Sequence, residues 1–175
     1  MIALLLFDFD QVLVDSEQFR HLRESRRWDQ YRRLVSELDP CAGVDQLIHF
    51  TSSLGYQMAI VTQSPSFIPK LFVQKRNWPI NNIVGWHDFK RPKPDPRCLQ
   101  VAMQRGNAKP SDSYHIGDLP SDTEASRRAG VKSIGAGWAV SDKEALRRSK
   151  PDYYFNTVEE LHDFIKAMKQ ASQSQ

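Results

Sequence analysis

The chain has little cysteine and no long apolar run. Its 175 residues include two cysteines, Cys41 and Cys98, whose spacing matches no metal-ligand pattern. A disulfide-stapled secreted scaffold and a cysteine-bound metal centre are therefore not indicated, and reduced thiols favour a cytoplasmic protein. The apolar stretches are much shorter than a membrane span, so the sequence predicts no membrane partner.

Strong charge of either sign is also missing. The net charge of +3 is too small to argue for nucleic acid by itself, although it does not repel an anionic substrate. The 40% of hydrophobic and 26% of charged residues are typical of a globular protein. The chain contains no repeat, linker or low-complexity block, so we expect one domain over residues 1–169, with a small insert at 16–40 and a frayed polar tail at 170–175.

The N-terminal stretch carries the strongest single signal. Residues 2–7 are all apolar, and Asp8 and Asp10 follow directly. An apolar run without alternation predicts a strand buried on both faces of a parallel sheet, and ligands bind beyond the carboxyl ends of such strands. The two carboxylates would lie on one side of the chain, close enough to share chemistry. Taken alone, the same pattern also occurs where a strand simply reaches water.

Two more strand ends carry polar groups. The strand expected at 57–61 ends in Thr62 and Gln63, where a hydroxyl and free backbone N–H groups suit a phosphate, while Ser64 can simply cap the next helix. The strand expected at 113–116 leads to Asp118 and Asp122. These ends repeat the pattern of the first strand.

Between these strands, Lys93 lies in a loop with three prolines that fixes its position, although a lone lysine is more often an ordinary surface residue. Helical patterns alternate with the strands, at 16–38, 44–54, 96–105 and 121–129. Capping boxes are expected at Ser121/Glu124, Ser141/Glu144 and Thr157/Glu160. This alternation predicts an α/β fold with a doubly wound parallel sheet.

In combination, the four signals resemble the haloacid dehalogenase (HAD) superfamily of phosphohydrolases. The nearest branch includes phosphoglycolate phosphatase and β-phosphoglucomutase, whose D-x-D-G-x-L-x-D-S opening corresponds to residues 8–16 and whose K-P-x-P signature corresponds to residues 93–96. The resemblance extends from residue 2 to about 164. It implies a Rossmann-like, HAD-like core with a minimal helical cap insert.

The resemblance also implies roles for the acidic residues. Asp8 would be the nucleophile that forms an aspartyl phosphate, and Asp10 would be the general acid and base. A Mg²⁺ ion would be bound by the carboxylates of Asp8 and Asp118 and by the backbone carbonyl of Asp10.

The phosphoryl oxygens would be held by Thr62, Gln63 and Lys93, with Asp122 positioning Lys93 or a water molecule. Arg20, His21 and Arg23, in the insert, are the candidates for contacts with the rest of the substrate. A solvated helix face is the ordinary alternative for these charges.

Two departures from the family pattern affect this interpretation. Gln11 replaces the usual Gly and Val12 the common Thr, so Gln11 must either adopt an unusual backbone conformation or alter the loop beside the site. Only 53 residues separate Asp8 from Thr62, too few for a full helical cap. We therefore expect a comparatively open site.

The apolar residues of the insert can pack against either of two surfaces. Trp28, Tyr31, Val35 and Leu38 have helical spacing and can pack against the core of the same chain or against a second subunit. A homo-oligomer is therefore one expected outcome.

The leading functional prediction is a Mg²⁺-dependent phosphatase that acts on a small phosphorylated metabolite. A bulky phosphorylated substrate or a nucleic-acid end is the alternative that an open site allows. A phosphomutase of the same superfamily and a non-catalytic phosphoacceptor or interaction domain remain as competing functions.

Overall fold

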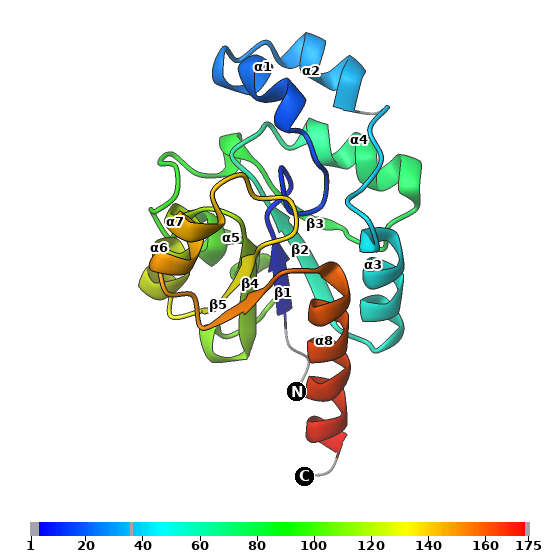
Figure 1. The fold of residues 1–175 in the computed structure, drawn as a ribbon, viewed down its shortest axis with the longest axis vertical. Helices are drawn as coiled ribbons and strands as arrows, with labels where there is room; N and C mark the ends of the chain where they lie inside the picture. Colours follow the sequence, from blue (N-terminus) through cyan, green and yellow to red (C-terminus); the bar gives the residue numbers. More distant parts are fainter. Residues whose placement is uncertain (1–3, 36, 174–175) are drawn as a thin grey trace.

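Six parallel strands form the central sheet of the protein in a computed structural model that describes residues 4–35 and 37–173 (Figure 1). Their spatial order is β3-β2-β1-β4-β5-β6. The strands are β1 (Leu4–Phe7), β2 (Gln57–Val61), β3 (Asn82–Val84), β4 (Ser113–Gly117), β5 (Lys132–Ala136) and β6 (Tyr153–Phe155).

The N-terminal strand lies at the centre of this sheet. β1 pairs with β2 on one side and β4 on the other, so that Leu6 lies opposite Ala59 and His115. All four β1 residues are buried. The apolar run therefore forms the doubly covered strand that the sequence predicts, although residues 2 and 3 of that run lie outside the described residues.

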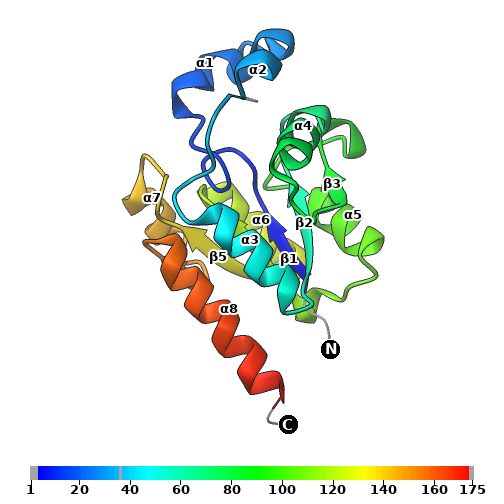
Figure 2. The same cartoon turned by 90° about the vertical axis from the view of Figure 1, so that its right-hand side faces the viewer.

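Helices cover both faces of the sheet (Figure 2). Leu5 and Phe7 pack into the apolar cluster formed with α3, α4 and α8, whereas Leu4 and Leu6 pack against α5 and α6. The predicted doubly wound α/β architecture is thereby confirmed. The core helices are α3 (Val44–Ser53), α4 (Phe67–Arg76), α5 (Arg97–Arg105), α6 (Pro120–Ala129), α7 (Lys143–Arg148) and α8 (Val158–Gln173).

The insert forms a helical hairpin over the carboxyl ends of the central strands (Figures 1 and 2). It comprises the 3-10 turn η1 (Glu17–Phe19), α1 (Arg20–Glu24) and α2 (Trp28–Val35). The helical pattern over 16–38 is divided into two short helices at Arg26, whose φ of 54° is left-handed. Because Trp28, Tyr31, Val35 and Leu38 belong to the main apolar cluster, these residues pack against the core of the same chain.

Two of the three predicted capping boxes are wrong. At the start of α6, the Leu119 N–H donates to Asp122 Oδ2 at 2.9 Å, so Asp122, and not Ser121 with Glu124, closes this turn. At the start of α7, Asp142, not Ser141 with Glu144, accepts from the Ala145 N–H at 2.8 Å. α6 begins at Pro120, so Ser121 and Glu124 lie inside the helix, whereas the N-cap of α7 falls on Asp142, one residue after Ser141.

The third capping box is confirmed. Glu160 N–H donates to Thr157 Oγ1 at 3.2 Å, and Thr157 N–H donates to Glu160 Oε2 at 3.4 Å. The helix that begins there, α8, continues to Gln173, so the tail predicted to fray from residue 170 is helical as far as the structure describes it. Lysine, glutamine and alanine near this end are good helix formers, which explains the extension.

Two 3-10 turns, η2 (Trp86–Asp88) and η3 (Pro110–Asp112), complete the regular structure. A membrane-spanning helix is not found among the described residues.

Candidate active site

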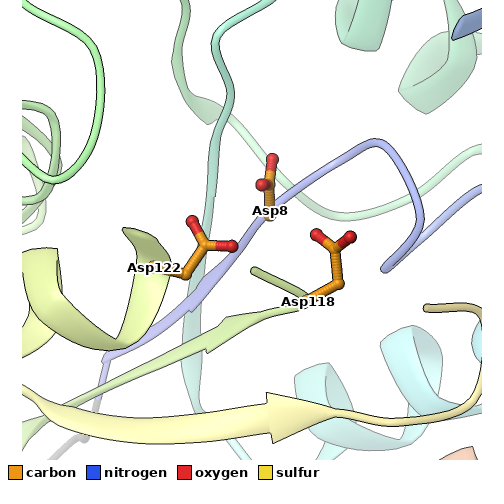
Figure 3. Close-up of side chains that lie close together, drawn as sticks. All are labelled: Asp8, Asp118 and Asp122. Carbon is orange, nitrogen blue, oxygen red and sulfur yellow. The ribbon is translucent and has the colours of Figure 1, made fainter. Parts of the chain in front are cut away.

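Three aspartates converge where β1 and β4 end (Figure 3). Asp8 directly follows β1, Asp118 follows β4, and Asp122 lies in the first turn of α6. One carboxylate oxygen of each lies within 4.8 Å of the other two, and all three residues are buried. Gly117 permits this approach, because a Cβ at that position would lie 2.4 Å from the Cβ of Asp122.

Lys93 links two of these carboxylates. Its Nζ lies 2.8 Å from Asp8 Oδ2 and 2.6 Å from Asp122 Oδ1. The other oxygen of Asp8 accepts a hydrogen bond from the Phe9 N–H at 2.7 Å. Lys93 is buried, and it does not line the cavity in front of Asp8. The lysine therefore fixes the orientation of the Asp8 carboxylate.

The three carboxylates carry more negative charge than one lysine compensates. Burial, opposed by the Lys93 charge, raises the pKa of Asp8 to about 6. Burial and repulsion from Asp122 and Asp8 raise the pKa of Asp118 to about 8. Although burial acts in the opposite direction, the Lys93 ammonium holds the pKa of Asp122 below its usual value. Asp8 and Asp118 are thus the two carboxylates whose ionised forms lack a sufficient counter-charge.

This donor set fits a small divalent cation. Mg²⁺ prefers oxygen ligands and is commonly bound by one or two carboxylates together with substrate phosphate and water. Since Asp122 is already paired with Lys93, Asp8 and Asp118 are the side chains that fit the role of ligands.

The Asp10 side chain lies outside this cluster, and residues of the insert contact it. Ser16 Oγ donates to Asp10 Oδ1 at 2.8 Å, Arg23 Nη1 pairs with the same oxygen at 3.0 Å, and the Tyr31 hydroxyl also donates to it. The second oxygen, Oδ2, accepts from Ser64 Oγ at 3.0 Å. Four side chains therefore hold one carboxylate.

Tyr31 and Ser64 are functional candidates that the sequence analysis placed elsewhere. Tyr31 was assigned to the apolar stripe of the insert, and its ring is indeed buried, while its hydroxyl reaches Asp10. The sequence allows Ser64 to cap the next helix, but α4 begins after Ser66, and the Ser64 hydroxyl donates to Asp10. A tyrosine within a stripe of otherwise apolar residues was the only sequence signal for the first contact.

The turn after β2 forms the opposite wall of the site. Thr62 is buried, and its Oγ1 accepts a hydrogen bond from the Ser64 N–H at 3.0 Å. Gln63 is exposed and lines the same cavity. The structure thus places the predicted phosphate-binding turn beside the aspartates.

A cavity of about 680 Å³ opens in front of these groups. Asp8, Asp10, Thr62 and Asp118 line its inner end, and Arg20 and Arg23 of the insert line its outer part. His21, the third residue predicted to contact substrate, is exposed and does not belong to the cavity wall.

The Gln11 backbone adopts the left-handed conformation, with φ of 63°. Its side chain donates from Nε2 to the Ala139 carbonyl at 2.9 Å, and its Oε1 accepts from the Ser16 N–H at 2.7 Å. The loop is further fixed by Trp138, whose indole N–H donates to the Val12 carbonyl at 2.9 Å. Gln11 thus takes the conformation that favours glycine, and its two hydrogen bonds compensate for the strain.

Comparison with known proteins agrees with this geometry. A family model described as haloacid dehalogenase-like hydrolase matches residues 19–136. The chain is 25% identical over 154 residues to pyrophosphatase PpaX of Bacillus velezensis, covering 87% of this chain and 67% of that protein. It is 29% identical over 113 residues to phosphoglycolate phosphatase of Vibrio parahaemolyticus, covering 63% of this chain and 50% of that protein.

Solved structures show the same fold. A Thermotoga maritima protein with the provisional name β-phosphoglucomutase superimposes with a TM-score of 0.79 at 21% identity, covering 95% of this chain and 99% of that chain. CbbY from Rhodobacter sphaeroides, determined in complex with phosphate, gives a TM-score of 0.76 at 17% identity, covering 92% and 96% of the two chains.

Proposed function

Because this chain belongs to the haloacid dehalogenase-like hydrolase family, we propose that it is a Mg²⁺-dependent phosphatase that hydrolyses a phosphomonoester through an aspartyl phosphate on Asp8. The observation that carries this proposal is the pairing of Asp8 with Lys93 at the inner end of an accessible cavity, beside Asp118 and Thr62. A carboxylate with a fixed orientation and an open face is suited to nucleophilic attack.

In the first step, an oxygen of Asp8 forms a bond to phosphorus, and the bond from phosphorus to the leaving oxygen breaks. Asp10, in its protonated form, supplies the proton that the leaving oxygen needs. In the second step, water attacks the phosphoryl group, Asp10 accepts its proton, and the Asp8 carboxylate is released together with inorganic phosphate.

Other residues of the chain stabilise the transferred group. Lys93 compensates charge next to the phosphoryl group, and the Thr62 hydroxyl, whose oxygen accepts from the Ser64 N–H, would donate a hydrogen bond to one of its oxygens. A Mg²⁺ ion held by Asp8 and Asp118 would neutralise negative charge on the phosphoryl oxygens.

The test is to trap the phosphoenzyme. In the Asp10→Asn variant, Asp8 should still attack a substrate with a good leaving group, such as acetyl phosphate. The phosphoenzyme should then hydrolyse slowly, because the attacking water is no longer activated. Mass spectrometry of the intact protein should then show an added phosphoryl group, located on Asp8 by peptide analysis. The double variant Asp8→Asn/Asp10→Asn is the matched control, and a phosphoryl group at another residue would refute the nucleophile assignment.

A second assay separates hydrolysis from phosphoryl transfer within a sugar. A structural neighbour carries the name β-phosphoglucomutase. Following hexose 1-phosphate by phosphorus NMR distinguishes release of inorganic phosphate, which we expect, from formation of a hexose 6-phosphate.

A further inference from the structure

The cavity in front of Asp8 extends well beyond the space that a phosphoryl group needs. Its volume of about 680 Å³ falls within the ~300–1,000 Å³ of pockets that hold whole small organic ligands. The inner end contains the acidic residues described above. The outer part is formed by the insert, the start of α4 and η2, and its composition differs from that of the inner end.

Three aromatic side chains line this outer part: Trp28, Phe67 and Trp86. They come from the starts of three different elements, α2, α4 and η2. Phe67 is 38% exposed, one of three large apolar side chains with such exposure among the described residues, and the two tryptophans are half-buried. Partly exposed aromatic side chains around a cavity are suited to bind a flat, apolar group.

Charge in the outer part is mostly compensated within the protein. Arg20 pairs with Glu17 at 2.8 Å, Arg23 pairs with Asp10 at 3.0 Å, and Glu24 adds a negative charge to the same wall. Arg20 and Arg23 are therefore already paired within the protein, and neither is free to bind a second phosphate or carboxylate.

Arg26 adds to the flat surface. Its guanidinium carbon lies 5.8 Å from the centre of the Trp86 ring, and Arg26 makes no ion pair in the part of the chain that the structure describes. A guanidinium plane stacks on nucleobases as an aromatic ring does. The insert and η2 thus together offer a stacking surface beside the reacting carboxylate.

We propose that the leaving group of the substrate carries a nucleobase, which makes a nucleoside 5′-monophosphate the substrate class of this site. This inference rests on the proposed phosphatase function. The phosphate would occupy the inner end of the cavity, the ribose its middle, and the base would stack among Trp28, Phe67 and Trp86.

The experiment compares two substrates that differ only by the base. We expect kcat/KM for adenosine 5′-monophosphate to exceed that for ribose 5-phosphate by about tenfold or more, because stacking of a base on aromatic side chains supplies such a factor. A ratio near one, or a clearly higher value for a sugar bisphosphate such as fructose 1,6-bisphosphate, would overturn the inference while leaving the phosphatase proposal intact.

Variants of the aromatic side chains in the outer part of the cavity test whether base stacking causes the difference between the two substrates. Phe67→Ala and Trp86→Leu should lower the ratio of the two kcat/KM values, a readout that partial misfolding does not change because misfolding scales both rates equally. Tyr153→Ala is the matched control, since Tyr153 is 37% exposed on β6 and does not line the cavity. An unchanged ratio in Phe67→Ala and Trp86→Leu contradicts the inference.

A binding measurement keeps the two proposals separable. If no phosphomonoester is hydrolysed, the phosphatase proposal fails. Quenching of tryptophan fluorescence by adenosine 5′-monophosphate, lost in Trp86→Leu, would still support the base site. Absence of quenching in the wild-type protein counts against it.

Discussion

Asp8 and Asp10 are separated by one residue but have different surroundings. Asp8 is held by Lys93 and by the Phe9 N–H, whereas Asp10 accepts hydrogen bonds from hydroxyl groups and from Arg23. A nucleophile needs a fixed oxygen with an accessible face, and a proton-transfer group needs partners that set its direction. The partners of Asp8 therefore suit a nucleophile, and the partners of Asp10 suit a proton-transfer group.

Tyr31→Phe tests the positioning of Asp10. The change removes one hydroxyl and leaves the buried ring, so the fold should persist. We expect kcat to fall by about tenfold, the equivalent of one hydrogen bond of about 1.4 kcal/mol, with KM within twofold of wild type. Steady-state kinetics measure both parameters.

The control for this variant is Tyr153→Phe, a tyrosine on β6 at the edge of the sheet. If Tyr31→Phe raised KM and left kcat unchanged, the hydroxyl would belong to substrate binding and not to Asp10.

At the scale of elements, the loop after β1 joins three parts of the molecule. Gln11 connects it to the 138–140 segment and to the start of the insert, and Trp138 adds a second link through Val12. Because Asp10 lies in this loop, its orientation depends on how firmly these contacts hold.

Replacing Gln11 separates backbone strain from hydrogen bonding. Gln11→Ala removes both side-chain hydrogen bonds and keeps a residue with a Cβ at φ of 63°. Gln11→Gly removes the same bonds and relieves the strain. We therefore expect Gln11→Ala to be less stable than Gln11→Gly by roughly 1 kcal/mol in urea unfolding. The reverse order would mean that the turn is not left-handed in solution.

The sequence predicted most of these elements and fewer of their contacts. The β2 range was predicted correctly, because an apolar run bounded by turn residues is a local signal. The capping of α6 was missed because the helix begins at Pro120, so Ser121 and Glu124 lie within it and Asp122 accepts from the Leu119 N–H. The Tyr31 contact with Asp10 spans 21 positions, and no local pattern encodes it.

The helical segment predicted over 16–38 is divided into two short helices for a related reason. Its apolar spacing is helical throughout, but packing both α1 and α2 against the core requires a reversal, which Arg26 provides in a left-handed conformation. Tertiary packing therefore overrides helix propensity here.

At the scale of the whole molecule, one buried histidine should make stability depend on pH. Burial and the Lys93 charge lower the pKa of His115 to about 4, from 6.5. Between these values the unfolded chain binds a proton that the folded protein does not bind, so His115 makes the protein lose stability as pH falls from about 6.5 to 4.

His115→Asn should remove this contribution. We expect the difference in unfolding free energy between wild type and variant to change by roughly 2 kcal/mol between pH 7.5 and 4.5, with wild type losing more as pH falls. Urea titrations at both pH values measure it, and exposed His49→Asn on α3 is the control. A difference that stays constant with pH would contradict the origin in His115.

Metal binding should also be visible in global stability. A ligand present at about ten times its Kd stabilises the folded state by about 1.4 kcal/mol, which corresponds to a rise in Tm of about 3 °C. We expect this rise with Mg²⁺ relative to EDTA, and its loss in Asp118→Asn but not in Asp163→Asn, whose side chain is exposed on α8.

Phosphatase activity should disappear in EDTA and return with Mg²⁺. Full activity in chelator would exclude the metal.

The central place of β1 in the sheet has a consequence for synthesis of the chain. β1 leaves the ribosome before the other five strands and can pair with β2 once residue 61 has emerged, but its other edge stays unpaired until β4 arrives at Ser113–Gly117. Pairing between strands that are far apart in the sequence forms slowly, and an unpaired apolar strand edge promotes aggregation. A nascent chain that stalls before residue 117 therefore exposes the most apolar strand of the protein, and we expect it to be a substrate for chaperones and proteases.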